Sequence, residues 1–524
     1  MFKSLTITLA QLNPSLGDLR HNYQKIVEVW EQAETDLVVF PELILCGYPP
    51  EDLVLKPFFL DEVERLTRDL VAKSKDFSSA ALISAPWRID GKTYIAVHLV
   101  SDGEIIGTVL KHNLPNYGVF DERRVFEPGP LPEVVVFKGV KLGIMICEDS
   151  WWPEPAEGLK AQGAEMLIVP NASPFTTDKY QRRLNTARAR VIQTNLPMVY
   201  VTQVGGQDDL VFDGGSFVMD AQGEVITQGK FFAEDVFIAG DNTLEPLLDE
   251  NERIYEAVKL GLRDYIGKNG FPGVVLGLSG GIDSALAAVI AVDALGADKV
   301  HAIMMPSEFT SQDSLDDAAE LSETLGIQYE IVPIKDAVKT FEGLLGEVLE
   351  DDLAHQNMQS RIRGLILMAV SNAGGKMVLS TGNKSEMAVG YATLYGDMNG
   401  GFNVLKDLYK TQVYALARWG GIISERVITK APTAELKADQ KDQDSLPPYE
   451  DLDAILHDLI EEEMGVEDIT AKGFDRETIV KVWRMMDRSQ YKRNQAPPGP
   501  KITRRSFGRE RRYPMTNHFS KMIE

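Results

Sequence analysis

The chain has 524 residues, of which 44% are hydrophobic, so it is long enough for two large globular domains. Its 78 acidic and 54 basic residues give a formal net charge of -24, which opposes long-range attraction to nucleic acid. The only two cysteines, Cys46 and Cys147, exclude a disulfide framework and a four-cysteine zinc site, and they point to a reducing compartment.

The N-terminal stretch MFKSLTITLAQLNPSLGD alternates polar and apolar residues and then turns, without the apolar core of a signal peptide. No apolar run along the chain is long enough to span a bilayer. We therefore expect a cytoplasmic protein with no membrane partner and no nucleic-acid partner.

Between Leu5 and about Gly240, short apolar runs alternate with helical patterns, which is the rhythm of layered α/β structure. A helix is predicted after Asp18, a candidate N-cap, because apolar residues recur three and four apart at Leu19, Tyr23, Ile26, Val27 and Trp30. Strands are predicted at residues 37–40, 80–85, 94–100, 105–110, 142–146, 166–170 and 198–204. Several of these runs are continuously apolar, which indicates sheets covered on one or both faces.

The strand rhythm stops within residues 239–253, where a polar, proline-containing stretch leads into a new helix. Beyond this stretch, strands are predicted at 274–278, 300–306 and 329–334, with helices from Ser284 and near Asp316. This alternation predicts a doubly wound parallel sheet. The sequence therefore indicates an α/β protein with two domains, residues 1–245 and 246–524.

Two segments of the second half lack a clear pattern of helices or strands. Residues 434–451 are acidic and aperiodic, so we expect them to form a mobile surface loop. The stretch from Lys492 to Arg512 is strongly basic and reverses the charge of the whole chain. For most of its basic residues we expect a solvated tail or a subunit contact.

Three reactive side chains directly follow apolar strand patterns in the first half: Glu42, Lys111 and Cys147. Taken alone, the two charges are explained as solvated loop residues, and the thiol as a small buried hydrophobe. Together they make a different arrangement, because a carboxylate base and an ammonium group activate a thiol as a nucleophile. The combination therefore favours Cys147 as an activated nucleophile.

The motifs around these residues, FPEL at Glu42, KHNLPNYGVFDERR from Lys111 and CEDSW from Cys147, resemble the nitrilase superfamily. That family hydrolyses carbon-nitrogen bonds, and the resemblance implies an N-terminal nitrilase-like α/β sandwich. It also implies that Glu42 is the general base, that Cys147 attacks a carboxamide carbon and that Lys111 stabilises the oxyanion. The superfamily has a second glutamate near its lysine, and here Glu122 and Glu148 both remain candidates.

The stretches LPNYGVFDERR and NASPF resemble the glutaminase subgroup of this superfamily. The resemblance implies that three residues contact a glutamine substrate: Tyr117, Ser173 and Lys179. The products would be a thioester on the cysteine and free ammonia.

The predicted strand at 274–278 runs into the sequence SGGIDS and then into a helix. A Gly-Gly pair alone is an ordinary turn, but small residues between a strand and a helix N-terminus let backbone amides approach a phosphate. The motif resembles the P-loop of the ATP pyrophosphatase family, which cleaves ATP between its α and β phosphates. The resemblance implies ATP contacts by Leu278, Ser279, Gly280, Gly281, Ile282, Asp283, Ser284 and Ala285.

Residues 380–413, STGNKSEMAVGYATLYGDMNGGFNVLKDLYKTQV, resemble NAD synthetases, which are members of that family with a Rossmann-like parallel sheet. The resemblance implies further ATP contacts by Thr381, Lys410 and Thr433. It assigns deamido-NAD contacts to Asn357, Arg361, Glu386 and Lys492. Two carboxylates, Asp283 and Glu386, are implied to hold Mg2+, a metal that completes its shell with water and phosphate oxygens.

Ordinary explanations stay open for some of these residues. Asn357 is equally typical of a helix cap or a polar helix surface, and Arg361 is typical of a solvated ion pair. The segments around Glu386 and Lys492 favour the dinucleotide, because they match the NAD synthetase pattern specifically.

Both halves together resemble the family of glutamine-dependent NAD synthetases along essentially the whole chain. The resemblance implies that glutamine, ATP and deamido-NAD are the small-molecule partners, that Mg2+ is required, and that the protein is a homo-oligomer with an ammonia tunnel. One alternative is an amidotransferase for another adenylated carboxylate. A purely regulatory module is the other alternative, and the presence of Glu42, Lys111, Cys147 and SGGIDS argues against it.

Overall fold

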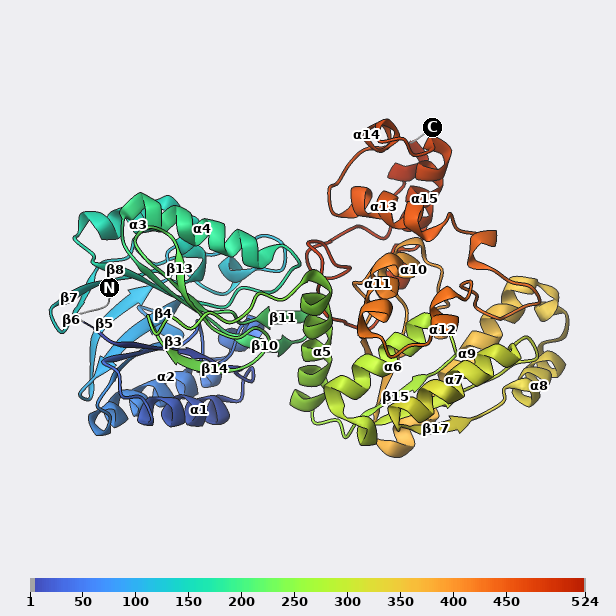
Figure 1. Cartoon of the computed structure of the whole chain (residues 1–524), viewed down its shortest axis with the longest axis horizontal. Coiled ribbons are helices and arrows are strands. Elements are labelled where there is room, and N and C mark those ends of the chain that lie inside the picture. Colours follow the sequence, from blue (N-terminus) through green and yellow to red (C-terminus); the bar gives the residue numbers. More distant parts are fainter. Residues whose placement is uncertain (1–4, 523–524) are drawn as a thin grey trace. The chain divides into compact units, whose positions relative to one another are not determined.

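The computed structural model describes residues 5–522, except for the side chain of residue 350. It divides into two compact units, Met1–Asp249 and Glu250–Glu524, and each unit is built from helices and strands (Figure 1). The predicted α/β class is confirmed. Within the described residues, no helix combines the length and the apolar character that a membrane span requires.

The first unit contains two six-stranded sheets. One sheet has the order β14 (Asp235–Ile238), β1 (Ile7–Gln11), β2 (Leu37–Val39), β3 (Ala80–Ile89), β4 (Lys92–Ser101), β5 (Glu104–Leu110). The other has the order β13 (Val225–Gln228), β12 (Phe217–Met219), β9 (Met198–Thr202), β8 (Met166–Asn171), β7 (Val140–Ile144), β6 (Val135–Phe137). In each sheet three neighbouring strands are parallel, β1 with β2 and β3, and β7 with β8 and β9.

Helices cover the outer faces of these sheets, α1 (Leu19–Glu31) and α2 (Pro57–Lys73) on one side and α3 (Pro153–Ala161) and α4 (Lys179–Thr194) on the other (Figure 1). The first helix begins where the sequence predicts, since the Asp18 carboxylate accepts a hydrogen bond from the His21 N–H at 3.1 Å. Its Trp30 is fully buried and donates to the Ser79 carbonyl at 2.8 Å. The unit is thus the nitrilase-like sandwich that the motifs predicted.

Strand β8 shows why its sequence is continuously apolar. Met166 and Ile168 belong to the core between the two sheets, whereas Leu167 and Val169 pack toward the helices α3 and α4. Successive strand residues point to opposite faces, so a sheet buried on both faces needs apolar side chains at every position.

The strand predicted at 198–204 is interrupted. It ends at Thr202 as β9, and β10 (Val204–Gln207) then pairs with β11 (Leu210–Asp213) in a separate hairpin. The break occurs because the Gln203 N–H bonds to the Asn171 carbonyl while the Val204 N–H bonds to the Leu12 carbonyl.

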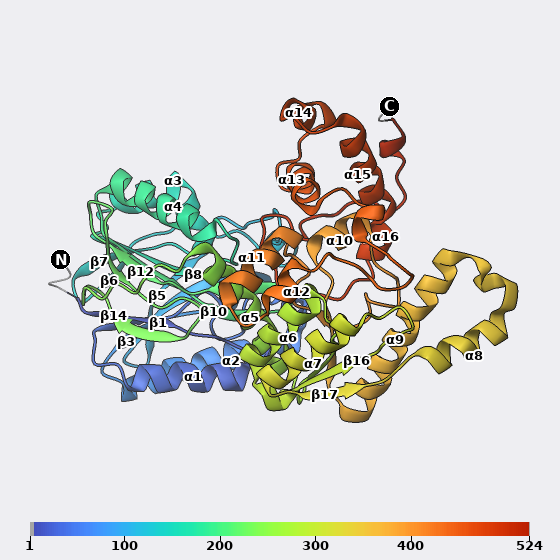
Figure 2. The same cartoon turned by 45° about the vertical axis from the view of Figure 1, so that its right-hand side comes forward.

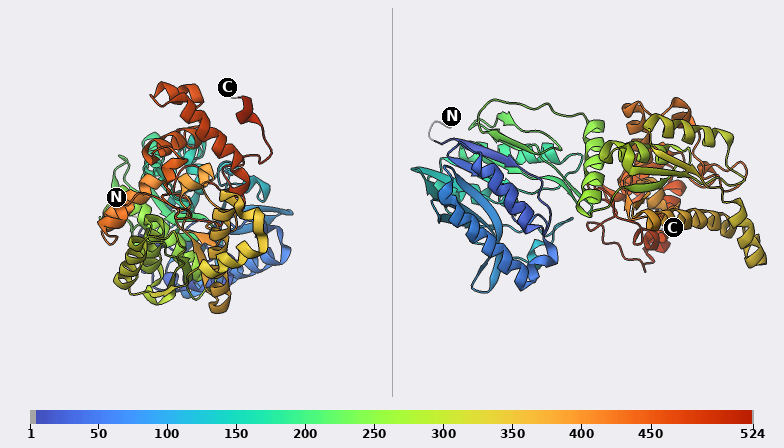
Figure 3. Two further views of the ribbon diagram at one scale, coloured as in Figure 1. Left: turned by 90° about the vertical axis from the view of Figure 1, so that its right-hand side faces the viewer. Right: turned by 90° about the horizontal axis from the view of Figure 1, so that it is seen from below.

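The second unit is built on a five-stranded parallel sheet with the order β17 (Gln328–Ile331), β16 (Val300–Met304), β15 (Val274–Gly277), β18 (Met377–Ser380), β19 (Phe402–Asn403). Helices α6 (Ile282–Leu295) and α7 (Gln312–Leu325) pack against strands β15 to β17, and α9 (Asp352–Gly374) packs against β15 and β18 (Figures 1 and 3). The chain winds outward from β15 in both directions, so the predicted doubly wound sheet is confirmed. Its switch point lies between β15 and β18, where such folds bind ligands.

The remaining helices of this unit surround the sheet or form a separate group. They are α5 (Glu250–Lys268), α8 (Lys335–Leu345), α10 (Lys384–Val389), α11 (Lys410–Gly420), α12 (Glu425–Thr429), α13 (Tyr449–Ile460), α14 (Val466–Ala471), α15 (Arg476–Arg488) and α16 (Gln490–Arg493). Helices α13, α14 and α15 gather together (Figure 2) and share an apolar cluster with α10. Short 3-10 turns lie at Glu51–Leu55, Ser74–Asp76, Glu122–Arg124, Cys147–Trp151, Ala297–Lys299, Gly346–Glu350, Asp442–Asp444 and Phe519–Met522.

Candidate active sites

A buried lysine of the first unit forms ion pairs with two carboxylates. Lys111 directly follows β5, and its Nζ lies 2.7 Å from Glu42 Oε1 and 2.8 Å from Glu122 Oε1. Glu42 stands three residues after β2, and all three side chains are buried. The structure therefore brings two of the predicted residues together and places Glu122 beside the lysine.

The charges of this trio depend on one another. Burial by itself lowers the pKa of Lys111, but Glu122 and Glu42 raise it well above its ordinary value, so the lysine is an ammonium ion. Burial raises the pKa of Glu122, which also accepts a hydrogen bond from the Tyr48 hydroxyl at 2.8 Å. A positive charge is thus fixed in an apolar environment, where it stabilises a developing anion strongly.

Cys147 is the first residue of the 3-10 helix Cys147–Trp151, which follows β7, and it has a φ of 45°. A positive φ is costly for a residue other than glycine and is often found at functional sites. Burial raises the pKa of the thiol well above its ordinary value, Glu42 raises it further, and Lys111 opposes both effects. The resting sulfur is therefore protonated and needs a base before it can attack, and Glu42 is a candidate for that base.

The turn is held by a carboxylate that the sequence analysis did not single out. Asp149 is fully buried, and its two oxygens accept from the Ile146 N–H at 3.1 Å and the Asn113 N–H at 2.7 Å. It therefore links the cysteine turn to the backbone just after Lys111. The only signal for Asp149 in the sequence is an acidic residue two positions after the cysteine.

The three residues predicted to contact glutamine have different surroundings. The Tyr117 hydroxyl donates to Glu148 Oε2 at 2.9 Å, so Glu148 is paired with the tyrosine and not with Lys111. The Ser173 hydroxyl is buried without a hydrogen-bond partner in the described part of the chain. Lys179 lies 4.3 Å from the centre of the Trp151 ring, and burial lowers its pKa to about 8.

The absence of a carboxylate partner for Lys179 within residues 5–522 is informative. Its side chain is only 9% exposed, and none of the described acidic groups lies within 4.0 Å of its nitrogen. The positive charge of a buried ammonium group that contacts only an aromatic ring is incompletely compensated. Binding of a ligand carboxylate next to Lys179 is therefore favoured. The unpartnered Ser173 hydroxyl supports the same interpretation.

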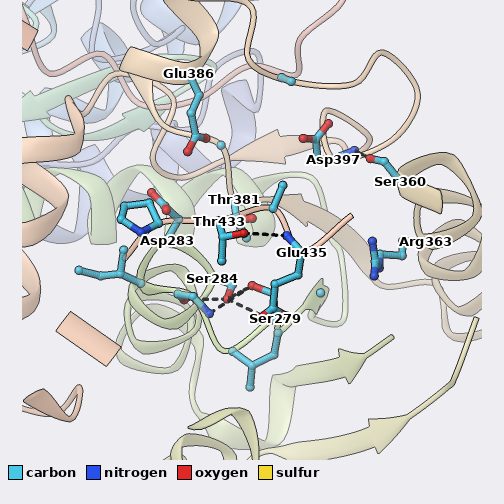
Figure 4. A pocket seen from close by; sticks show the side chains of 18 of the residues that line it. Ser279, Asp283, Ser284, Ser360, Arg363, Thr381, Glu386, Asp397, Thr433 and Glu435 are labelled. Atoms are coloured by element: carbon cyan, nitrogen blue, oxygen red, sulfur yellow. Dashed lines mark hydrogen bonds between the residues drawn. The ribbon is translucent and has the colours of Figure 1, made fainter. Parts of the chain in front are cut away.

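In the second unit a cavity of about 280 Å³ opens at the switch point of the sheet (Figure 4). Ten of the predicted residues line it: Leu278, Ser279, Gly281, Ile282, Asp283, Ser284, Thr381, Glu386, Lys410 and Thr433. The first six follow β15 and Thr381 follows β18, so the topology of the sheet brings them together.

The loop after β15 is held by the hydroxyl of Ser284, which contacts the Ser279 N–H at 3.1 Å and the Gly281 carbonyl at 3.0 Å. Gly280 has a φ of 77°, and a Cβ at this position would lie 2.3 Å from the Ser314 carbonyl oxygen. Gly280 and Ala285 do not line the cavity, because Gly280 packs against Ser314 and Ala285 is buried in α6. The helix begins at Ile282, two residues earlier than predicted, so Asp283 lies in its first turn.

Asp283 and Glu386 share one cationic partner. Lys410 Nζ bonds to Asp283 Oδ2 and lies 3.6 Å from Glu386 Oε1, while Asn383 Nδ2 donates to Asp283 Oδ1 at 2.8 Å. Two carboxylates that converge on one point fit Mg2+, which binds few protein oxygens and completes its shell with water and phosphate. Within the described residues, no cluster of three or more histidine, cysteine or acidic side chains could hold a metal.

The other residues predicted to contact deamido-NAD do not line this cavity. They meet the segment that follows α10, since Asn357 accepts from the Thr393 hydroxyl at 2.8 Å and Arg361 donates to the Leu394 carbonyl at 3.2 Å. Lys492 donates to the carbonyls of two residues of the same segment, Gly390 at 2.8 Å and Ala392 at 2.7 Å. Arg361 thus contacts a backbone carbonyl of this segment, and its role at the dinucleotide stays a prediction.

The structure adds cavity residues that sequence reasoning missed, among them Ser360, Arg363, Asp397, Glu435 and Asp442. Arg363 donates to the Met305 carbonyl at 3.0 Å, and burial lowers the pKa of its guanidinium to about 10. A second arginine two residues after Arg361 is the only sequence signal for it.

The expectation of a surface loop at 434–451 is wrong for part of that segment. Asp442 is 4% exposed and accepts from the Tyr449 hydroxyl at 2.8 Å, and Leu446 belongs to the apolar cluster around α13. Thr433 to Leu436 line the cavity. A single buried acid within an aperiodic segment leaves no periodic pattern, which is why the sequence did not indicate Asp442.

Comparison with known proteins agrees with this two-site arrangement. A carbon-nitrogen hydrolase family model matches residues 6–240, and a NAD synthase family model matches residues 254–496. A glutamine-dependent NAD(+) synthetase of Rhodobacter capsulatus is 47% identical, covering 98% of this chain and 98% of its own. The chain belongs to the glutamine-dependent NAD(+) synthetase family.

Two further relatives support this membership. A glutamine-dependent NAD(+) synthetase of Acinetobacter baylyi is 45% identical over 98% of this chain and 99% of its own. A solved structure from Acinetobacter baumannii, a glutamine-dependent NAD+ synthetase in complex with ADP, is 43% identical with a TM-score of 0.78 and covers 98% of this chain and 99% of its own. The family resemblance that both halves of the sequence predicted is confirmed.

A further buried lysine lies in the helix that carries Glu386. Lys384 stands in α10, two residues before Glu386, and its Nζ lies 2.9 Å from Asp407 and 2.6 Å from Glu461. It also donates to the Thr503 hydroxyl at 2.6 Å and to the Arg505 carbonyl at 2.8 Å. The group therefore fastens the C-terminal segment to the helix that carries Glu386.

The basic C-terminal stretch is consequently not all a solvated tail. Arg493 and Lys501 are each 4% exposed, and Lys501 lies 3.1 Å from Glu510. Arg493 donates to carbonyls of α10, including that of Ala388. The expectation of a solvated tail is wrong for these residues, because Lys501 pairs with Glu510 and Arg493 donates to backbone carbonyls inside the unit.

Replacing Lys384 with methionine should destabilise the second unit by about 3–5 kcal/mol, because it leaves Asp407 and Glu461 buried without their cation. Denaturant unfolding measures the loss, and hydrogen exchange should show faster opening of 383–389 and 501–507. The exposed Lys339→Met in α8 is the matched control, expected to change stability by less than about 0.5 kcal/mol. Unchanged exchange in both segments would contradict the role of Lys384.

Proposed function

We propose that this protein makes NAD from deamido-NAD, with glutamine as the nitrogen source and ATP as the activating substrate. The single observation that supports this most directly is the presence of two separate buried lysine–carboxylate sites in one chain, one beside a cysteine and one beside a phosphate loop. The first suits amide hydrolysis, and the second suits the activation of a carboxylate by ATP.

In the first reaction, Glu42 takes the thiol proton while the sulfur of Cys147 attacks the side-chain carbonyl carbon of glutamine. The carbonyl oxygen becomes an oxyanion that the Lys111 ammonium stabilises. Glu122 holds Lys111 in position, and Tyr48 in turn holds Glu122. The carbon-nitrogen bond then breaks, the nitrogen leaves as ammonia with the proton from Glu42, and a thioester remains. Water hydrolyses the thioester to glutamate by the same proton route.

Lys179, Ser173 and Tyr117 are proposed to bind glutamine itself. Lys179 is buried without a carboxylate partner in the described chain, so it suits the substrate's α-carboxylate. The free hydroxyl of Ser173 and the Tyr117–Glu148 pair supply polar groups for the other end of the amino acid.

In the second reaction, a carboxylate oxygen of deamido-NAD attacks the α-phosphorus of ATP, which forms an adenylate and releases pyrophosphate. Ammonia then attacks the activated carbonyl carbon, and the carbon-oxygen bond to AMP breaks to give NAD. The amides of the Ser279–Ser284 loop, the α6 N-terminus, Thr381, Thr433 and Lys410 suit the phosphates of ATP. Mg2+ held by Asp283 and Glu386 would neutralise charge on the leaving pyrophosphate.

Deamido-NAD is proposed to bind across the segment 390–394, beside Glu386. Asn357, Arg361 and Lys492 all contact this segment, and they add two positive charges for a substrate that carries a pyrophosphate and a ring carboxylate. This region distinguishes deamido-NAD from other adenylated carboxylates.

We also propose that the protein is a cytoplasmic homo-oligomer. Two buried free thiols, Cys46 and Cys147, suit a reducing compartment.

Neutral ammonia is a minor species at neutral pH, so a sheltered route between the two reactions would preserve the nucleophile.

Cys147→Ala is expected to abolish NAD formation driven by glutamine and to leave ammonium-driven formation within about twofold of the parent, because the thiol serves only the amide hydrolysis. The assay follows NAD, AMP and pyrophosphate from deamido-NAD and ATP with either nitrogen source. Asp283→Asn is the matched variant of the other site and should impair both. Loss of both activities in folded Cys147→Ala, release of ADP, or preference for an unrelated acid would contradict the proposed function.

The specificity constant for glutamine should fall as the pH rises through about 8, because the Lys179 ammonium loses its proton there and no longer attracts a carboxylate. The ammonium is fully charged below this pH, so no loss is expected on the acidic side from this group. Initial-rate glutaminase kinetics between pH 6.5 and 9.5 measure the effect. Lys179→Arg keeps its charge over this range and should remove the decline, and an identical decline in that variant would contradict the role.

Lys492→Ala should raise the KM for deamido-NAD about tenfold or more with little change in glutaminase activity measured alone, because it removes a cation from the proposed dinucleotide region. Steady-state kinetics with varied deamido-NAD at saturating ATP provide the test. Arg488→Ala, on the neighbouring helix α15, is the control. An unchanged KM for deamido-NAD would rule Lys492 out as a substrate contact.

A further inference from the structure

The ammonium group of Lys410 sits where two acidic side chains converge. It bonds to Asp283 at the start of α6 and lies 3.6 Å from Glu386 in α10, and its own backbone begins α11. The Tyr449 ring centre is 5.3 Å away, and the lysine is 2% exposed. Figure 4 shows Asp283 and Glu386 on the wall of the same cavity.

The surroundings are strongly acidic and have few other cations. Asp442 lines the same cavity and is 4% exposed. The two other basic residues of the cavity are engaged elsewhere, since Lys430 lies 3.8 Å from Asp317 and Arg363 donates to the Met305 carbonyl. Within residues 5–522, Lys410 is therefore the cation within 4.0 Å of both Asp283 and Glu386.

These contacts create a conflict with the proposed function, on which this inference rests. Asp283 and Glu386 are assigned there to Mg2+, and Lys410 to a phosphate of ATP. A divalent cation and an ammonium group cannot both lie between the same two carboxylates, because their repulsion at such a distance is large in a buried site. One of them must leave when the other binds.

We propose that Lys410 is an exchangeable place-holder for the metal. Without nucleotide its ammonium occupies the position proposed for the metal and compensates two partly buried carboxylates, of which Asp283 also accepts a hydrogen bond from Asn383. When Mg2+ arrives with ATP, the metal takes the carboxylates and the ammonium moves to the phosphate oxygens, which are a new partner in the same cavity. Nucleotide therefore supplies the group that makes displacement of the lysine favourable.

The exchange makes a thermodynamic prediction that a fixed ion pair does not make. Metal binding alone displaces Lys410 from both carboxylates without supplying a phosphate as its new partner, so the metal binds more weakly until ATP is present, and the two ligands are positively coupled. If Lys410 instead only supported the shape of the site, its removal would weaken metal binding. The two interpretations thus differ in the sign of the effect of one substitution.

Titration of the full-length protein with Mn2+, followed by electron paramagnetic resonance, tests this inference. In the absence of nucleotide, Lys410→Met should bind Mn2+ about tenfold more tightly than the parent, because the carboxylates are left free for the metal. With α,β-methylene-ATP present, the parent should gain affinity for Mn2+ and the variant should gain much less. Lys410→Arg retains the charge and should keep the weak binding of the parent.

Lys430→Met is the matched control, a lysine of the same cavity that contacts Ser314 and Asp317 instead. It should leave the affinity for Mn2+ without nucleotide unchanged. Lys410→Gln serves as a second neutral variant if the methionine variant does not fold. Equal or weaker Mn2+ binding by the neutral variants overturns the place-holder role.

A separate outcome concerns the proposed function itself. Asp283→Asn should remove the Mn2+ site seen with nucleotide in the parent. If that variant binds Mn2+ with nucleotide as well as the parent does, the metal assignment of Asp283 is wrong, whatever Lys410 does. Failure of the place-holder inference and failure of the metal assignment are therefore distinguished.

Discussion

An ammonium group buried between two carboxylates is the constraint on which both candidate sites depend. Lys111 lies between Glu42 and Glu122 in the first unit, and Lys410 contacts Asp283 and Glu386 in the second. An isolated charge in a protein interior costs several kcal/mol, so each lysine requires acidic partners held at contact distance. The folded chain must supply both acids before either lysine is tolerated inside.

The sheets supply these partners through their topology. In the first unit, Lys111 follows β5, Glu42 follows β2 closely and Cys147 follows β7, so segments far apart in the chain meet at strand ends. In the second unit the ends of β15 and β18 flank the switch point of the sheet. The polar side chains that follow these strands hold one another in position through ion pairs, such as those of Lys111 with Glu42 and Glu122.

The two lysines nevertheless suit different chemistry. Lys111 and Tyr48 are both hydrogen-bonded to Glu122 in a network made of protein groups. This network favours a lysine that stays charged and can stabilise an oxyanion. Lys410 faces a cavity that an anionic nucleotide can enter, so its partners can change during the reaction. Lys384, compensated by Asp407 and Glu461 away from this cavity, keeps the helix of Glu386 attached to the C-terminal segment.

The sequence by itself determined the α/β class, most strands and the family, because apolar periodicity and short motifs such as CEDSW and SGGIDS are local properties of the chain. It also indicated Glu42, Lys111 and Cys147 as reactive groups that follow strands. It left Glu122 and Glu148 as equal candidates, and only the folded chain placed Glu122 beside the lysine and Glu148 beside Tyr117.

Asp149, Asp442 and the buried Lys384 group were decided by tertiary structure alone. A buried charge is recognised by its partners, and these partners come from segments that are separated in the sequence by up to 121 residues, as between Lys384 and Arg505. Local patterns record which face of an element is apolar, but they carry no information about which distant acid compensates a given base. That pairing exists only once the sheets have brought the segments together.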